Sequence, residues 1–179
     1  MPVLITSRLT CSPLQEQDWP FFLALQQHPD VMRFVAEDRP VAAIREAFDS
    51  RLTPWTPGSA HWLCLVVRDA ASRAPLGVTG YIHREEDCAE VGFLFAPEAQ
   101  GKGYGFESLK ALCDYAFDQG GIRRLTATVT AGNVASRRLL EKARFCLEGE
   151  LLESYYLAGR WQNDWLFGLL QQEYLNNNS

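Results

Sequence analysis

The sequence predicts a mixed α/β fold in which helices pack on one central sheet. Segments whose apolar residues recur with a helical period alternate with short apolar segments that are typical of strands. Short polar turns join several of the strand segments, which indicates antiparallel hairpins at both ends of this arrangement. Because the middle of the chain runs strand, helix, strand, helix, we expect a mixed sheet covered by helices.

The first third of the chain predicts one strand, two helices and a loop. Residues 8–12 have the composition of a strand. Residues 16–27 carry large apolar side chains at helical spacing, and Pro29 ends that helix. A second helix is expected over 40–52, because proline is favoured at a helix start. The prolines and the glycine within 52–59 indicate a loop.

The centre predicts a hairpin followed by a long amphipathic helix. Strands are expected at 61–68, 76–83 and 89–95, and the polar turn 84–87 predicts antiparallel pairing of the last two. Residues 103–119 form one apolar stripe at helical spacing, and the glycines that follow end the helix. The remaining predicted elements are a strand at 124–129, a helix from its cap Asn133 to 143, and paired strands at 145–156 and 161–170.

Length and composition predict one domain over residues 1–179. Hydrophobic residues make up 47% of the 179 residues, which excludes a disordered chain. The apolar runs are far shorter than a bilayer requires, and the start lacks the pattern of a secretory signal, so no membrane association is expected. The polar residues 176–179 are expected to form a disordered tail.

Cysteine and histidine usage indicates a reducing environment and no metal. The five cysteines are scattered, their number is odd, and none forms a C-x-x-C pair. This pattern argues against a disulfide framework and favours a cytoplasmic location. The three histidines share no ligand spacing, so we expect no metal site.

The charge is unevenly distributed. The formal net charge is −5, which disfavours direct nucleic-acid binding. Residues 100–145 nevertheless hold eight basic and four acidic residues, whereas the rest of the chain holds nine basic and 18 acidic ones. Two interpretations stay open at this point: ion pairs on helix surfaces, or a small-anion site in a protein whose other surfaces attract cations.

The segment from Gln100 to Gly105 is the most informative one. It follows a strand, contains three glycines and opens a helix, so its backbone N–H groups can approach an anionic ligand closely. Lys102 adds a full positive charge, and the whole predicts a pyrophosphate cradle. A dinucleotide fingerprint is excluded because position 108 is serine, and a P-loop is excluded because Gly103 follows the lysine.

Two blocks resemble the GNAT N-acetyltransferase family. Residues 89–105 resemble its acetyl-CoA motif Q/R-x-x-G-x-G/A, and residues 133–145 resemble its N-x-x-S…L-x-E-K-x-G-F helix, in the family's order and separation. The likeness spans about residues 7–170 and is nearest the branch that acetylates the N-terminal alanine or serine of ribosomal proteins. It implies a mostly antiparallel sheet, splayed at the cofactor strand, with helices on both faces and a CoA-binding core at about 89–145.

The resemblance implies that acetyl-CoA is the co-substrate and that no metal takes part. In the family, the strand before the loop pairs with the pantetheine arm, the glycine loop holds the pyrophosphate, and the second block contacts the arm again. The matching positions here are Phe93, Leu94, Phe95, Gln100, Gly101, Lys102, Gly103, Tyr104, Gly105, Phe106, Asn133 and Ser136. For Asn133, simple helix capping is compatible with this role.

Three residues are catalytic candidates for direct attack of an amine on the thioester. Glu90 lies on the binding strand and is a candidate base, directly or through water; the alternative is an edge-strand charge in solvent. Ser136 is a candidate proton donor to the sulfur. Tyr155, like its neighbour Tyr156, is expected near the slot, with core packing as the alternative for one of the two.

The sequence departs from the family pattern at three positions. Leu140 replaces a tyrosine acid that many relatives carry, Thr128 stands where some N-terminal acetylases place a glutamate base, and Arg144 replaces a glycine. A site with modest base strength should favour amines of low pKa, because an α-amino group has a pKa of about 7.7–8.0 and a lysine side chain about 10.4.

The acceptor and the function class stay partly open. Within an N-acetyltransferase, the acceptor is a small-molecule amine or a protein N-terminus, and some family members are homodimers. Thr128 and Leu140 leave a non-catalytic acyl-CoA-binding or sensing module as the alternative. The third interpretation is an interaction domain in which the glycine loop is only a turn.

Overall fold

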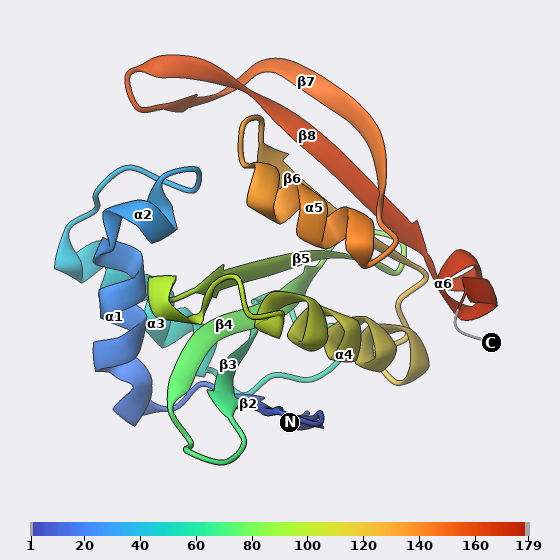
Figure 1. The fold of residues 1–179 in the computed structure, drawn as a ribbon, viewed down its shortest axis with the longest axis horizontal. Coiled ribbons are helices and arrows are strands. Elements are labelled where there is room, and N and C mark those ends of the chain that lie inside the picture. Colours follow the sequence, from blue (N-terminus) through green and yellow to red (C-terminus); the bar gives the residue numbers. More distant parts are fainter. Residues whose placement is uncertain (1, 178–179) are drawn as a thin grey trace.

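The computed structural model describes residues 2–177 and contains one eight-stranded sheet with the strand order β1-β2-β3-β4-β5-β6-β8-β7 (Figure 1). Every neighbouring pair is antiparallel except β5 and β6, which confirms the predicted mixed sheet. The strands are β1 (Leu4–Ile5), β2 (Leu9–Pro13), β3 (Leu63–Asp69), β4 (Pro75–His83), β5 (Cys88–Phe95), β6 (Arg124–Thr130), β7 (Cys146–Leu157) and β8 (Arg160–Leu170).

Helices cover both faces of the sheet. They are η1 (Glu16–Asp18), α1 (Trp19–Gln27), α2 (Pro29–Met32), α3 (Val41–Leu52), η2 (Pro97–Ala99), α4 (Tyr104–Asp118), α5 (Val134–Lys142) and α6 (Gln171–Asn177). β1, α2 and α6 were not predicted, because two to seven residues are too few to show a period. The expected tail is partly helical, since Asn176 and Asn177 belong to α6, and 178 and 179 lie outside the described residues.

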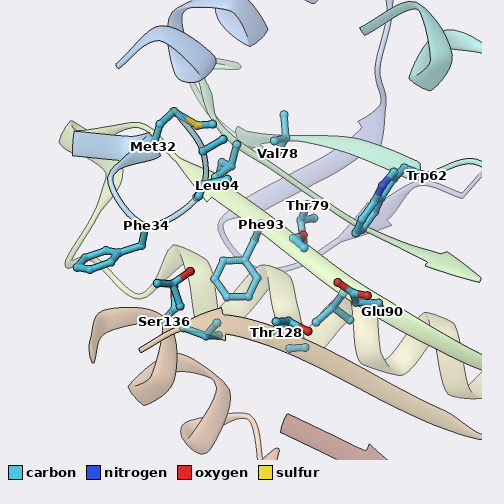
Figure 2. A pocket seen from close by; sticks show the side chains of 18 of the residues that line it. Met32, Phe34, Trp62, Val78, Thr79, Glu90, Phe93, Leu94, Thr128 and Ser136 are labelled. Atoms are coloured by element: carbon cyan, nitrogen blue, oxygen red, sulfur yellow. The ribbon is translucent and has the colours of Figure 1, made fainter. Parts of the chain in front are cut away.

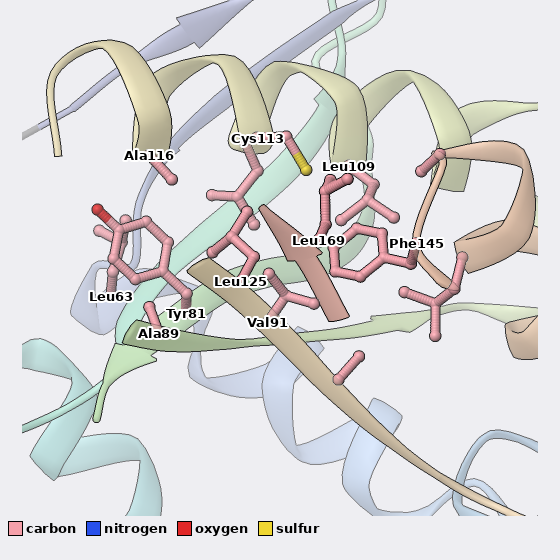
Figure 3. Close-up of a cluster of buried hydrophobic side chains, with 14 of the residues drawn as sticks. Leu63, Tyr81, Ala89, Val91, Leu109, Cys113, Ala116, Leu125, Phe145 and Leu169 are labelled. Carbon is pink, nitrogen blue, oxygen red and sulfur yellow. The ribbon is translucent and has the colours of Figure 1, made fainter. Parts of the chain in front are cut away.

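Successive side chains of β3 point alternately into two separate hydrophobic cores. Leu63, Leu65 and Val67 face a core that α4 covers, whereas Cys64 and Val66 face a core built with α1 and α3. Figure 3 shows the first core, where side chains of α4 point toward those of the strands. The amphipathic stripe expected for the long central helix therefore packs on the sheet.

Both predicted hairpins are present. β4 and β5 are antiparallel neighbours in register from Gly77↔Phe95 to His83↔Ala89. β7 and β8 are joined by a two-residue turn at Ala158 and Gly159, whose φ angles of 55° and 78° match the turn that suits hairpin twist.

The sheet divides between β5 and β6. These strands pair only from Cys88↔Arg124 to Glu90↔Thr126, and beyond this point β5 continues along β4 while β6 continues along β8. The predicted splay at the cofactor strand is therefore present, and it starts at Glu90. Among residues 2–177, no helix combines the length and apolar character that a bilayer crossing requires.

Candidate functional site

A cavity of about 470 Å³ opens from the splay between β5 and β6. One wall consists of β5, β6 and the start of α5, and the other wall comes from α1, α2, α3 and the segments between them. Figure 2 shows Phe93 and Ser136 on the two sides of the gap, with Phe34 near Ser136 and Met32 near Leu94. The cavity therefore joins the predicted cofactor strand to a wall that the motifs do not describe.

Glu90 lies at the fork of the two strands. It is the last β5 residue paired with β6, its side chain lines the cavity, and 28% of that side chain is exposed. Its carboxylate accepts hydrogen bonds from Nε and Nη2 of Arg84 at 3.2 and 3.0 Å. Thr128 faces the same space from β6 (Figure 2). The carboxylate is thus both held and accessible, as a base requires.

Asn133 and Ser136 lie at the start of α5, across the splay from β5 but on the same wall of the cavity. The side-chain oxygen of Asn133 accepts a hydrogen bond from the backbone N–H of Ser136 at 3.3 Å, so the predicted cap is present. Both residues line the cavity. The Asn133 amide nitrogen is not used by this cap and can serve a ligand. Leu140, one turn beyond Ser136, is fully buried and gives the cavity an apolar surface where relatives carry a tyrosine.

Tyr155 reaches the cavity from β7. A register shift between Leu151 and Tyr155 displaces this part of the strand, and the tyrosine hydroxyl donates a hydrogen bond to the carbonyl of Val35 at 2.7 Å. The hydroxyl therefore ties the β7–β8 hairpin to the segment between α2 and α3. The neighbouring Tyr156 is exposed and packs edge-on against Trp161, away from the cavity lining.

The glycine loop lies outside the cavity lining, at the start of α4. Gly101 and Gly103 have φ angles of 74° and 83°, in the left-handed region that favours glycine. Gly103 is the N-cap and supplies no side-chain cap, so the first N–H groups of α4 stay available for an anion. Gln100 donates to the carbonyl of Phe95 at 3.0 Å, which fixes the loop to the end of β5.

Side chains around the loop hold it in place. Nη1 of Arg8 donates to the carbonyl of Lys102 at 3.0 Å, and the Arg8 guanidinium lies 4.6 Å from the ring centre of Tyr104. A Cβ on Gly105 would lie 3.1 Å from Leu139, so the first turn of α4 rests against α5. Lys142 lies 4.3 Å from the Phe106 ring centre. The two sequence blocks are therefore in contact.

The third departure from the family pattern affects only a turn. Arg144 has a φ of 76°, so the backbone keeps the left-handed conformation for which relatives use glycine. The chain still turns from α5 into β7, because the N–H groups of Arg144 and Phe145 bond to carbonyls of α5 at 3.0 and 2.9 Å.

Comparison with known proteins decides the family. The family profile described as "Acetyltransferase (GNAT) domain" matches residues 8–146, more than half of the chain. The chain belongs to the GNAT acetyltransferase family. Together with the splay and the glycine loop, this membership makes the protein an acetyl-CoA-dependent N-acetyltransferase. It also disfavours the non-catalytic module and the interaction domain.

Two of the three relatives named below span nearly the whole acetyltransferase. An uncharacterized N-acetyltransferase p20 of Bacillus licheniformis is 26% identical over 178 residues, covering 97% of this chain and 99% of that protein. The spermidine N(1)-acetyltransferase of Vibrio cholerae is 34% identical over 96 residues, 54% of each chain. A crystal structure of spermidine N-acetyltransferase from Vibrio cholerae, in complex with CoA and spermine, has a TM-score of 0.83 and 26% identity, covering 96% of this chain and 100% of that one.

The acetyltransferase also has a cysteine in the cavity wall. Cys64 is buried, and burial raises the pKa of its thiol to about 12. A thiol with such a pKa stays protonated at neutral pH and is a poor nucleophile. The burial of Cys64 therefore favours direct transfer of the acetyl group to the amine over transfer through a cysteine.

Sequence reasoning missed the wall formed by residues 22–51. Arg39 and Arg51 in this wall line the cavity together with Trp62, which directly precedes β3, and no motif marked any of the three. One signal was present for Arg51: it follows Ile44 and Phe48 on the buried stripe of α3, at the spacing i, i+4, i+7. A charged residue on an apolar stripe is a reason to expect a site.

Proposed function

We propose that the acetyltransferase carries out direct transfer in a ternary complex, with acetyl-CoA in the splay and the amine in the cavity. The observation that supports this most strongly is the fork at Glu90, where β5 and β6 separate and the cavity begins. The exposed backbone edge of β5 beyond Glu90 offers groups for a pantetheine arm, and the α4 N-terminus offers N–H donors for a pyrophosphate.

We assign the cofactor contacts to the two walls of the splay and to the loop. Phe93, Leu94 and Phe95 contact the pantetheine arm from β5, and Asn133 and Ser136 contact it from α5. The loop residues Gln100, Gly101, Lys102, Gly103, Tyr104, Gly105 and Phe106 shape the pyrophosphate site. The segment 89–145 is thus the CoA-binding core of a single domain.

In the proposed reaction the neutral amine attacks the thioester carbonyl, the new C–N bond forms, and the C–S bond breaks. Glu90 takes the proton that the amine loses, directly or through water, because its carboxylate is exposed to the cavity at the fork. Ser136, on the α5 side of the splay, delivers a proton to the leaving sulfur. Tyr155 is a positioning residue: its hydroxyl bonds to the carbonyl of Val35 and so holds the segment between α2 and α3 in the acceptor wall.

The acceptor is a small-molecule amine or a protein N-terminal α-amine. Relatives named as spermidine acetyltransferases support a small amine. The likeness of the two sequence blocks to the ribosomal-protein N-terminal acetylases supports an α-amine. Because their pKa is lower, α-amines cost about 3.4 kcal/mol less to deprotonate than lysine side chains. This difference matters because position 140 is leucine, and the site therefore lacks the tyrosine that many relatives carry there.

The test of this function is release of free thiol from acetyl-CoA in a panel of amines at neutral pH. We expect turnover with at least one α-amine or small primary amine, and slower turnover with the lysine side chain of an N-terminally blocked peptide. Thermal stabilisation by acetyl-CoA without thiol release for any amine would contradict the proposed reaction. Equal rates for lysine side chains and α-amines would contradict the proposed preference.

A homodimer and a cytoplasmic location complete the proposal. β7 is an edge strand, and its hairpin with β8 exposes large apolar side chains: Leu147, Leu151, Leu152, Tyr156 and Trp161. Exposed apolar clusters of this kind favour association. Sedimentation of the purified protein at micromolar concentration tests the proposed homodimer, and a monomer would contradict it.

The five free cysteines support the proposed cytoplasmic location, because the cytoplasm keeps thiols reduced.

A further inference from the structure

Arg51 occupies an unusual place in the cavity wall. It lies on α3, is half-buried, and shares the buried stripe with Ile44 and Phe48. Its guanidinium lies 5.9 Å from the ring centres of Phe22 and Trp62, and its Nη1 donates to the carbonyl of Ala47 at 3.0 Å. The side chain is therefore held between aromatic rings, with its charge at the cavity.

A second guanidinium lines the same cavity. Arg39, in the segment between α2 and α3, donates a hydrogen bond to the side-chain oxygen of Gln26. Burial lowers the pKa of Arg51, the nearby Cys64 thiol opposes this, and the positive charge of Arg39 lowers the pKa further. Arginine nevertheless stays charged at neutral pH. Two positive charges therefore share one wall.

Within residues 2–177, no carboxylate forms an ion pair with Arg39 or Arg51. The two acidic side chains that line the cavity have other partners, because Glu90 binds Arg84 and Asp164 accepts from the hydroxyl of Ser154 at 2.8 Å. Holding a partly desolvated charge without a counter-ion is costly, and an anionic ligand would offset this cost.

We propose that the natural acceptor carries an anionic group, and that Arg51 and Arg39 bind this group while the amine points toward Glu90. This inference rests on the proposed function. The Trp62 ring lies between the two poles: a Cβ on Gly92 would lie 3.2 Å from it, and Figure 2 shows the ring next to Glu90. An acceptor lying on Trp62 would place its amine at the acidic end and its acid group at the basic end. A carboxylate suits the guanidinium fork, as does a phosphonate.

The proposal separates this enzyme from its named relatives. Spermidine is a polycation, and two uncompensated guanidinium groups in the acceptor wall would repel it. An amine that also carries an acid group matches the charges of this wall better.

The experiment compares matched pairs of acceptors that differ only in the acid group. The pairs are L-methionine with L-methioninamide and 2-aminoethylphosphonate with ethylamine, and spermidine serves as the cationic acceptor. We expect the wild type to acetylate the acid of one pair about 10-fold or more faster, in kcat/KM, than its neutral partner. Because the amine of the amide has the lower pKa, its intrinsic reactivity opposes this result. The pair that shows the preference identifies the anionic group as carboxylate or phosphonate.

Variants of the two arginines test whether they cause the preference for the acid acceptor. Arg51→Gln should raise KM for the acid acceptor about 10- to 100-fold and KM for the neutral partner much less, because only the acid acceptor loses charge-assisted hydrogen bonds. Arg51→Lys should recover part of the loss, and Arg39→Gln should have a smaller effect in the same direction. Arg73→Gln is the matched control, because it removes the same charge from the exposed turn between β3 and β4.

A binding readout keeps the inference testable apart from turnover. In the presence of CoA, N-acetylmethionine should raise the melting temperature more than N-acetylmethioninamide, and Arg51→Gln should remove the difference. Preference for neutral amines or spermidine, with Arg51→Gln leaving selectivity and product binding unchanged, would overturn the inference and leave the proposed function standing. Absence of turnover with every amine would instead contradict the proposed function, and product binding would still decide the role of the arginines.

Discussion

The two walls of the cavity are built in different ways. The wall of β5 and α5, with the glycine loop beside the cavity, presents backbone groups, and its side chains serve mainly to hold that backbone: Gln100 bonds to Phe95 and Asn133 caps α5. The wall formed by residues 22–51 presents side chains, among them Arg39 and Arg51. A backbone site suits a constant partner such as acetyl-CoA, whereas a side-chain site can change with the acceptor without disturbing the fold.

This difference predicts separate kinetic effects for the two walls. Changes at the loop should alter the KM for acetyl-CoA, and changes at the opposite wall should alter the KM for the amine. Strong effects on kcat are expected only where protons move, at Glu90 in the fork and at Ser136 on α5.

The largest effect is expected at the fork. Glu90→Gln should lower kcat about 100-fold or more at neutral pH, because general-base catalysis is lost while the shape is kept. The KM for acetyl-CoA should stay within a factor of about two. Steady-state kinetics with saturating amine measure both. Arg84→Gln is the companion variant, since it removes only the partner of the carboxylate. An unchanged kcat in Glu90→Gln would identify the residue as a solvent-facing charge.

The next effect is expected in the glycine loop. Gly103→Val places a β-branched side chain at a φ of 83°, and its Cβ would lie 3.2 Å from Arg8. The displaced backbone should raise the KM for acetyl-CoA about 100-fold, because small misplacements of a binding loop are costly. Gly149→Val is the matched control, as a Cβ there meets nothing within 4 Å. Normal acetyl-CoA binding by Gly103→Val would show that the loop is only a turn.

A smaller effect concerns the support of the loop and its pH dependence. Burial alone would raise the pKa of Glu107, but hydrogen bonds from Thr6 and Arg8 lower it overall. A lowered pKa in the folded state adds stability above the unfolded value of about 4.3, and this stability is lost as pH falls through the folded pKa. Glu107→Gln should therefore cost about 1–2 kcal/mol of unfolding free energy at pH 7 and less at pH 3. Denaturant titrations at both pH values measure this, and a loss that is equal at both would contradict the account.

On the acceptor wall, Tyr155→Phe removes the hydrogen bond to Val35. Loss of one such bond corresponds to about 0.5–1.5 kcal/mol, so the KM for the amine should rise about 2- to 10-fold. The KM for acetyl-CoA should not change. A fall in kcat alone would instead indicate that the hydroxyl takes part in proton transfer.

The smallest effect is expected at Lys102. Its side chain is exposed, and exposed charges contribute little in water, so Lys102→Ala should raise the KM for acetyl-CoA only about 2- to 5-fold. The effect should shrink further at high salt. A 100-fold loss would mean that the lysine, rather than the backbone, supplies most of the binding.

The sequence predicted the sheet, its hairpins, the glycine loop before α4 and the cap of α5, because these depend on local signals. Glycines at 101, 103 and 105 and the cap Asn133 act within a few residues of their own backbone. The acceptor wall depends on contacts over long sequence separations, such as that of Tyr155 with Val35, which no local pattern contains. Arg51 was missed as well, although its spacing from Ile44 and Phe48 on α3 is a local signal.

The most direct test of the two-wall account is the melting temperature with and without acetyl-CoA at a hundredfold excess over its Kd. Binding to the native state should add about 2.7 kcal/mol, which corresponds to a rise of about 5–10 °C. We predict this rise for the wild type, Glu90→Gln and Arg51→Gln, and its loss in Gly103→Val. No rise in the wild type, or an equal rise in Gly103→Val, would contradict the assignment of the glycine loop and β5 to the cofactor.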